Sequence, residues 1–169
     1  MAIGTALKKR SDKVAFFGVS DSSGGTVTYH RMQGFTELST SKNSTEYARQ
    51  YVDRDMEETD VVGYSPSMGY NFDAYVGNAV HTDIAKITDE EMTGLDAVRP
   101  IIVVDMTEDG TEEGSKAAIK RDYAVIPDAE GDGTDAYTYS GTLKVKGEKE
   151  KVEVTSADDW MTVTLVESV

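Results

Sequence analysis

The chain has 169 residues, about the size of one domain, and 38% of them are hydrophobic. With only three prolines and ordinary glycine content, this composition excludes a long disordered or low-complexity chain. The absence of cysteine excludes disulfides, thiolate metal sites and thiol nucleophiles.

The formal net charge of −14 is concentrated in the middle of the chain. Residues 53–113 hold sixteen acidic and three basic residues, whereas residues 1–52 hold four acidic and seven basic ones. An acidic surface repels phosphate, which argues against a protein that grips the nucleic-acid backbone. A solvated acidic surface, without any partner, also explains this distribution.

The N-terminus carries a basic cluster, Lys8, Lys9, Arg10 and Lys13, followed by an apolar run at 14–19. This run is too short for a signal-peptide core or a membrane span, so we expect the whole chain to be the mature, soluble protein. Residues 1–13 show no strand pattern. We expect a single domain over 1–169, of which 1–13 form a flexible N-terminal arm.

Apolar and polar residues alternate along most of the chain, which is typical of half-buried antiparallel strands. We expect strands at 14–19, 26–38, 45–53, 61–75 with a break near Pro66, 100–106, 115–126 and 160–166. Strands and helices do not alternate as they do in parallel sheets. The pattern predicts a mainly β fold, an antiparallel β-sandwich or barrel with one flanking α-helix.

The flanking helix is predicted from residues 78–96, where the period of two is lost. Val80, Ile84 and Ile87 stand at helical spacing. Thr88 and Glu91 have the form of a capping box before Met92 and Leu95.

Four lysines, Lys144, Lys146, Lys149 and Lys151, lie within the stretch 136–156. Alternation up to Val145, a turn at Gly147 and Glu148, and alternation again from Val152 predict a β-hairpin. In that hairpin the lysines share one exposed face with Glu148, Glu150 and Glu153.

No catalytic or metal-binding motif is present in the sequence. The two histidines, His30 and His81, lack metalloprotease spacing, and there is no nucleophile elbow, P-loop or dinucleotide-binding motif. The segment "DAEGDGTD" places Asp128, Glu130, Asp132 and Gly133 like the start of a calcium loop, but its twelfth position is Tyr139 instead of glutamate. We expect an Asp- and Gly-rich turn there, no cofactor, no metal and no enzymatic activity.

The order of several segments between Tyr29 and Val166 resembles the tail tube (major tail) proteins of long-tailed bacteriophages, especially those that infect Gram-positive bacteria. The most telling segments are "SKNSTEYARQYVD", "GYSP", "YNFDAY" and "DAYTYSGTLKVKGE".

The resemblance implies a structural role. Such proteins have a small β-sandwich or barrel with a flanking helix, and six copies join strands into one continuous ring-shaped β-barrel. Rings stack into the hollow tube through which the genome passes, bridged by a terminal arm and a long loop. The implied partners are further copies, the tape-measure protein, tail initiator and terminator proteins, and double-stranded DNA that passes without specific binding. No membrane partner is implied, and the implied location is the virion tail, assembled in the host cytoplasm.

The resemblance also suggests roles for charged residues. A wall of carboxylates does not hold phosphates, so Glu37, Glu46, Asp53 and Asp55 are candidate lumen-facing acids. The lysines Lys144, Lys146, Lys149 and Lys151 form either a solvated edge or an electrostatic patch that meets the acidic loops "DMEETD" or "TEDGTEEG" of a neighbouring copy.

Two other functions remain open from the sequence. One is the inner tube of a contractile tail or of a phage-derived injection device, which a separate sheath surrounds. The other is a stand-alone glycan-binding β-sandwich, against which the single tryptophan, Trp160, argues mildly. An enzyme is a distant third.

Overall fold

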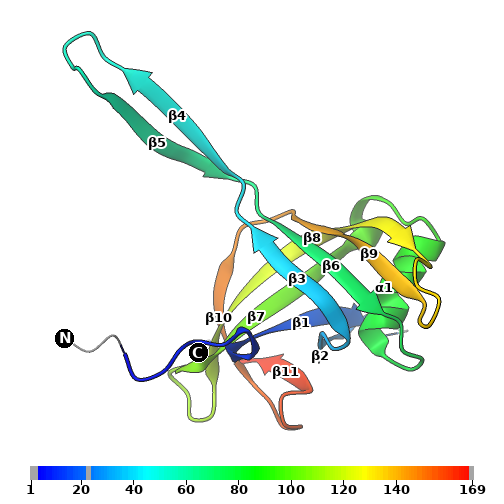
Figure 1. The fold of residues 1–169 in the computed structure, drawn as a ribbon. Helices are drawn as coiled ribbons and strands as arrows, with labels where there is room; N and C mark the ends of the chain where they lie inside the picture. The colour runs from blue at the N-terminus through cyan, green and yellow to red at the C-terminus, as the bar shows by residue number, and fades with distance from the viewer. Residues whose placement is uncertain (1–3, 22–23, 168–169) are drawn as a thin grey trace.

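The computed structural model describes residues 4–21 and 24–167, and this part of the chain is mainly β (Figure 1). The strands are β1 (Lys13–Ser20), β2 (Val27–Arg31), β3 (Phe35–Ser41), β4 (Ser44–Gln50), β5 (Glu57–Tyr64), β6 (Ser67–Asp73), β7 (Val98–Asp109), β8 (Lys116–Glu130), β9 (Thr138–Val145), β10 (Glu150–Thr155) and β11 (Thr162–Leu165). The helix is α1 (Ala79–Asp89), and two 3-10 turns are η1 (Arg10–Asp12) and η2 (Gly94–Ala97). Residues 1–3 of the predicted N-terminal arm lie outside the described residues.

Six strands close into an antiparallel β-barrel. Their order is β10–β11–β2–β1–β7–β8, and pairing of β10 with β8 completes the ring. Closure leaves these strands without an exposed edge along the paired segments. The predicted barrel with one flanking helix is therefore confirmed, with further strands outside the ring.

The long strand β8 connects the barrel to those further strands. Along one edge β8 pairs with β7 through Ala124. Along its other edge it pairs first with β10, over 116–120, and then with β9, over 123–130. Strands β9, β6 and β3 continue outward from this second segment, which creates a four-stranded sheet β8–β9–β6–β3 beside the barrel (Figure 1).

Two hydrophobic cores lie on the two faces of β1. Phe16 points into the barrel with Ile102 and Val154. Phe17 points outward into a second core, between the barrel, the four-stranded sheet and α1, which also contains Phe72 and Ile84. Because side chains alternate along a strand, burial of consecutive residues from Val14 to Gly18 means that both faces of β1 are covered.

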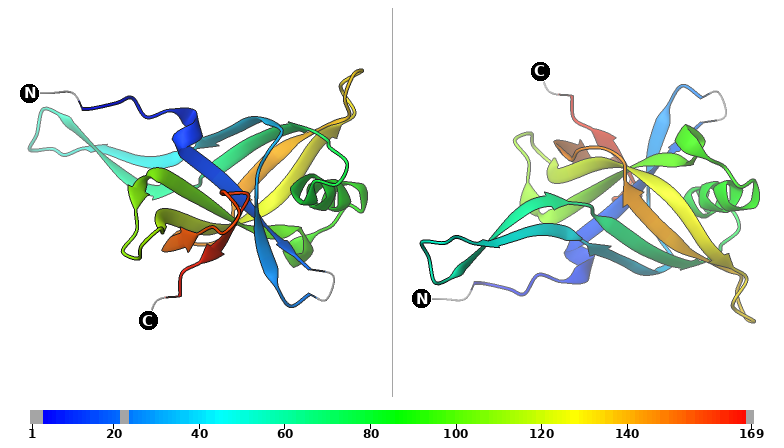
Figure 2. Two further views of the ribbon diagram at one scale, coloured as in Figure 1. Left: turned by 90° about the horizontal axis from the view of Figure 1, so that it is seen from below. Right: turned by 90° about the horizontal axis from the view of Figure 1, so that it is seen from above.

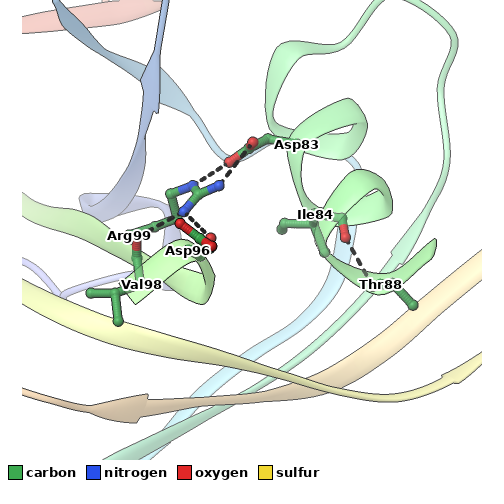
Figure 3. A network of polar contacts seen from close by, with 6 residues as sticks. All are labelled: Asp83, Ile84, Thr88, Asp96, Val98 and Arg99. Carbon is green, nitrogen blue, oxygen red and sulfur yellow. Dashed lines mark hydrogen bonds and ion pairs between the residues drawn. The ribbon is translucent and has the colours of Figure 1, made fainter. Parts of the chain in front are cut away.

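The helix buries the stripe that the sequence predicted. Val80, His81, Ile84 and Ile87 are its buried residues, and the side chain of Asn78 caps its start by accepting hydrogen bonds from the amides of residues 80 and 81. The predicted capping box at Thr88 is wrong. Thr88 lies in the last turn of α1, where its hydroxyl donates to the carbonyl of Ile84 at 2.8 Å (Figure 3).

Arg99 fixes the helix to the barrel (Figure 3). Its Nε donates to Oδ2 of Asp83, on α1, at 2.7 Å, and Nη2 donates to Oδ1 at 3.4 Å. Its Nη1 donates to the carbonyl oxygens of Asp96, at 2.7 Å, and Val98, at 2.9 Å. One guanidinium therefore holds α1, η2 and the start of β7 together.

The predicted strand 26–38 is two strands that belong to different parts of the fold. β2 stays in the barrel and β3 becomes the outer strand of the four-stranded sheet, with the chain turning between Met32 and Gly34. Gly34 has φ +77°, a conformation that favours glycine, and an added Cβ would lie 3.0 Å from the ring of His81. The predicted break near Pro66 is confirmed between β5 and β6.

The predicted hairpin over 136–156 is wrong. β9 and β10 do not pair with each other but follow one another along the same edge of β8, with Lys144 opposite Ala124 and Glu150 opposite Lys120. The fifteen residues of β8 provide room for both strands. Between them, the carbonyl of Gly147 accepts a hydrogen bond from Nε of Arg121 at 2.7 Å.

Candidate assembly surfaces

The four-stranded sheet has one apolar face and one face of small polar residues. In β6, buried and half-buried residues alternate without exception, so that Tyr70 and Phe72 enter the core. The opposite face carries cross-strand rows of polar residues, which are Glu37–Asn71–Ser140, Ser39–Gly69–Thr142 and Ser41–Ser67–Lys144. Over β3, β6 and β9 this surface, the polar face, is built mainly from serine, threonine, asparagine and glycine. On β8 the row of Thr142 continues with Ile126, which is 43% exposed.

Glu37 brings a carboxylate to the polar face. Its Oε1 lies over Gly69, where an added Cβ would approach it to 2.9 Å, and it accepts a hydrogen bond from the hydroxyl of Ser39 at 3.3 Å. The other three predicted lumen acids lie elsewhere. Glu46 is on β4, and Asp53 and Asp55 are in the turn between β4 and β5.

The four-stranded sheet ends in two open edges. Within the described residues β3 pairs only with β6, so its outer edge has no strand beside it. On the far side, β8 continues to Glu130, whereas its pairing with β7 stops at Ala124. Such edges template the pairing of further strands unless something blocks them.

β4 and β5 form a two-stranded hairpin that projects away from the rest of the molecule (Figures 1 and 2). All seven residues of β4 are exposed, and so are all residues of β5 except Gly63. An isolated two-stranded hairpin is marginally stable in water. The hairpin is thus built as an arm, without packing from the two cores.

The arm combines acidic and apolar side chains. Residues 44–64 contain six acids and two arginines. Its exposed large apolar residues are Tyr47, Tyr51, Val52, Met56, Val61, Val62 and Tyr64. The arginines are used within the arm, where Arg49 lies over the ring of Tyr47 at 5.4 Å and Arg54 pairs with Glu58. The remaining acids make the arm a negatively charged, partly apolar surface.

A groove of about 530 Å³ lies between the N-terminal segment and β3. One rim of this groove is formed by Lys8, Lys9, Arg10 and Lys13, and the other by residues 36–40. Its floor contains the apolar residues Ala15, Met68 and Val103. We call it the basic groove. The basic residues of the predicted N-terminal arm are therefore part of a surface shared with β3.

Two of the rim cations are held by their own chain. Nζ of Lys8 binds Oδ2 of Asp105 at 2.5 Å, and this contact holds the pKa of the Asp105 carboxyl far below its usual range. Arg10 donates to the carbonyl of Lys13 at 2.6 Å and to that of Leu38, on the open edge of β3, at 3.1 Å. Lys9 and Lys13, in contrast, form no ion pair with any described residue.

The four predicted patch lysines are all exposed but do not share a face. Lys144 stands opposite Ala124 and Lys151 opposite Ile119, so the two project to opposite sides of β8. Glu153 was predicted to lie on the same face as the lysines, but its carboxylate contacts the loop 110–115 of its own chain. There its carboxylate accepts hydrogen bonds from the amide and hydroxyl of Thr111, which lower the pKa of Glu153.

His81 is a structural residue of the second core. Its Nε2 donates to the carbonyl of Gln33 at 2.6 Å, its Nδ1 accepts from the amide of Tyr75 at 3.1 Å, and its ring stacks on Phe72. Burial lowers the pKa of His81, partly offset by the contact with Gln33. No group of three His, Asp or Glu side chains in the described part of the chain is arranged to hold a metal ion.

Among the described residues, no helix has the length and apolar character needed to cross a membrane.

No protein-family model matches the chain, and no curated protein matches it. Among solved structures, the chain is similar to one from the baseplate of the anti-feeding prophage, determined by cryo-EM with 6-fold symmetrisation. The two chains are 8% identical, with a TM-score of 0.46, over 89% of this chain and 97% of the other. At this level the likeness establishes neither a common function nor a common partner.

Proposed function

We propose that the protein is a structural tail tube subunit, of the kind that long-tailed phages of Gram-positive bacteria use, whose copies assemble into stacked hexameric rings around a hollow lumen. The observation that carries the proposal is the four-stranded sheet β8–β9–β6–β3. It has an apolar face buried in its own subunit, a face of small polar residues, and an open edge on each side.

A sheet with these properties is suited to forming part of a ring wall. Joining β3 of one copy to the end of β8 of the next is a heterologous contact, which closes into a ring when the rotation per copy allows it. Six copies supply about 24 strands at ~4.8 Å spacing, which with ordinary strand tilt gives a barrel ~45–50 Å across between backbones. Such a barrel has room for duplex DNA.

The polar face then lines the lumen, with Glu37 as its carboxylate. Short hydroxyl and amide side chains present no fixed cation to phosphate, so DNA slides past without specific binding. Lys144, at the end of one row, is the exception among the residues of the three rows. The three other predicted lumen acids, which lie on the arm, belong in this proposal to contacts between copies.

The proposal includes the partners that a tube requires, which are the tape-measure protein and the tail initiator and terminator proteins, and a location in the virion tail. It assigns no catalytic activity. The same subunit geometry also suits the inner tube of a contractile tail or of a phage-derived injection device. Co-purification of a sheath protein with the tube would distinguish such a contractile system from a non-contractile tail.

Negative-stain electron microscopy of the concentrated protein, with a variant of the β3 edge, tests this function. The carbonyl of Leu38 points outward to Arg10, and backbone groups of a strand alternate, so the amide of Thr40 also points away from β6. Thr40→Pro removes that donor, and Thr40→Ala keeps it. We expect hollow tubes from the wild type and from Thr40→Ala, and folded monomers from Thr40→Pro. Tubes from Thr40→Pro, or a wild type that stays monomeric and binds a glycan array, would overturn the proposal.

A further inference from the structure

The outer edge of β3 has no strand beside it, but it is in contact with the N-terminal segment of its own chain. Within the described residues β3 pairs only with β6, and the backbone groups of alternate residues point to the other side. The carbonyl of Leu38 is one of these outward groups, and it accepts a hydrogen bond from Nη2 of Arg10 at 3.1 Å. This carbonyl is an acceptor that a strand added to the edge would use.

Further contacts hold Arg10 in this place. Its Nη1 donates to the carbonyl of Lys13, at the start of β1, at 2.6 Å. The amide of Lys9 donates to Oδ2 of Asp12 at 2.7 Å, and the amide of Asp12 donates to the carbonyl of Lys9 at 3.0 Å, which closes the turn η1 around Arg10. On the other side of the turn, the ion pair of Lys8 with β7 ties the segment to the barrel. The guanidinium therefore bridges the start of β1 and the middle of β3.

The guanidinium occupies the position that an incoming strand needs. The amide nitrogen of a paired strand would lie about 2.9 Å from the Leu38 oxygen, and its backbone would run ~4.8 Å from that of β3. Nη2 of Arg10 is already 3.1 Å from the same oxygen. Charged side chains at sheet edges are one means by which proteins prevent uncontrolled pairing. A strand can pair along the middle of β3 only after Arg10 has moved away.

We propose that Arg10 is an edge-blocking residue, which occupies the β3 edge in the free subunit and delays the joining of copies. Assembly then requires the release of Arg10 from Leu38 before the edge accepts a strand. That the incoming strand is β8 of a second copy rests on the proposed function. The block of the β3 edge does not depend on which strand arrives.

Arg10→Ala and Lys9→Ala separate the block from the effect of charge. Arg10→Ala removes the guanidinium from the edge, whereas Lys9→Ala makes the same charge change one residue away, at a side chain that forms no ion pair with any described residue. Both residues are exposed, so neither change disturbs a core. The chain carries a net charge of −14, so loss of a cation increases the repulsion between copies and by itself slows association. The block predicts the opposite sign for Arg10→Ala alone.

Light scattering and sedimentation velocity over a concentration series measure the association. We expect Arg10→Ala to associate about three- to tenfold faster than the wild type, the size that one exposed hydrogen bond from a charged donor gives. Lys9→Ala should associate no faster than the wild type. Adding Thr40→Pro to Arg10→Ala should abolish the gain, because the released edge then lacks an amide. An Arg10→Ala protein that is no faster than Lys9→Ala, or a gain that survives Thr40→Pro, would overturn the proposal.

Microscopy of the same samples separates this inference from the tube function. Tubes that form at the same rate from Arg10→Ala and Lys9→Ala would leave the tube standing without the block. Faster association of Arg10→Ala through the β3 edge into particles other than tubes would leave the block standing without the tube. Monomers from every variant at every concentration would overturn both.

Discussion

The side-chain amide of Asn43 donates hydrogen bonds to the carbonyl of Ser65 at 3.0 Å and to the hydroxyl of Ser67 at 3.1 Å. Asn43 has φ +48°, in the left-handed region that asparagine tolerates better than most residues. These bonds join the two chain segments at the base of the arm. We expect these two bonds to orient the arm relative to the sheet.

Asn43→Gly keeps the backbone conformation and removes both side-chain bonds. Because the cores do not involve this site, we expect the free energy of unfolding to change by less than about 1 kcal/mol. Hydrogen exchange in β4 and β5 should become faster and tube formation slower. Unchanged exchange and assembly in this variant would show that the two bonds do not orient the arm.

The ion pair of Arg99 with Asp83 is partly buried, with side chains 17% and 14% exposed. Arg99→Ala leaves Asp83 and two carbonyl groups without their donor, and we expect it to cost about 2–4 kcal/mol in urea unfolding. The control is Lys116→Ala, whose partner Asp109 is 81% exposed, with an expected cost of about 0–1 kcal/mol. Equal losses in the free energy of unfolding for the two substitutions would contradict the role of Arg99 in holding α1 against the barrel.

His81 makes stability depend on pH in a defined direction. Burial lowers its pKa in the folded protein, whereas the unfolded chain has the ordinary value of about 6.5. Below about pH 6.5 the unfolded state therefore binds more protons, so this contribution is full above that pH and declines as the pH falls. His81→Gln should flatten the fall in melting temperature on acidification. Parallel profiles for wild type and His81→Gln would exclude this role.

Glu37→Lys places a cation on the polar face at the position that now carries a carboxylate. If that face lines the lumen, tubes of this variant should retain duplex DNA at low salt and release it at high salt, because lysine–phosphate contacts are salt-sensitive. Glu148→Lys makes the same change on the segment between β9 and β10 and is the control. DNA retention by filter binding that is equal in the two variants would place Glu37 outside the lumen.

The sequence was most informative where packing is local. Outside the arm, alternation located most strands because at least one face of these strands contacts a core, and the spacing of Val80, Ile84 and Ile87 located the helix for the same reason. The candidate assembly surfaces were harder to predict from the sequence. The sequence placed Glu37 on a strand, as the structure does, but it did not predict the basic groove, because the groove depends on β3 lying beside the N-terminal segment.

The wrong predictions concern which strands pair with each other. The chain does bend at Gly147, but a bend does not determine which strand the flanking residues pair with. The length of β8 decides this, because it supplies a ladder for both β9 and β10. At the break between β2 and β3, Gly34 has φ +77° and lies close to His81, which is distant in sequence.

Cross-linking tests whether the four-stranded sheets of neighbouring copies join edge to edge. The chain has no cysteine, so Thr40→Cys on the β3 edge and Ala129→Cys on the end of β8 provide the two reactive groups. Two strands lie between them within one copy, so a short bismaleimide joins them mainly between copies. We expect a ladder of covalent oligomers that ends at the hexamer, and no ladder from either single-cysteine variant. Monomer alone, under conditions in which the protein assembles, would contradict it.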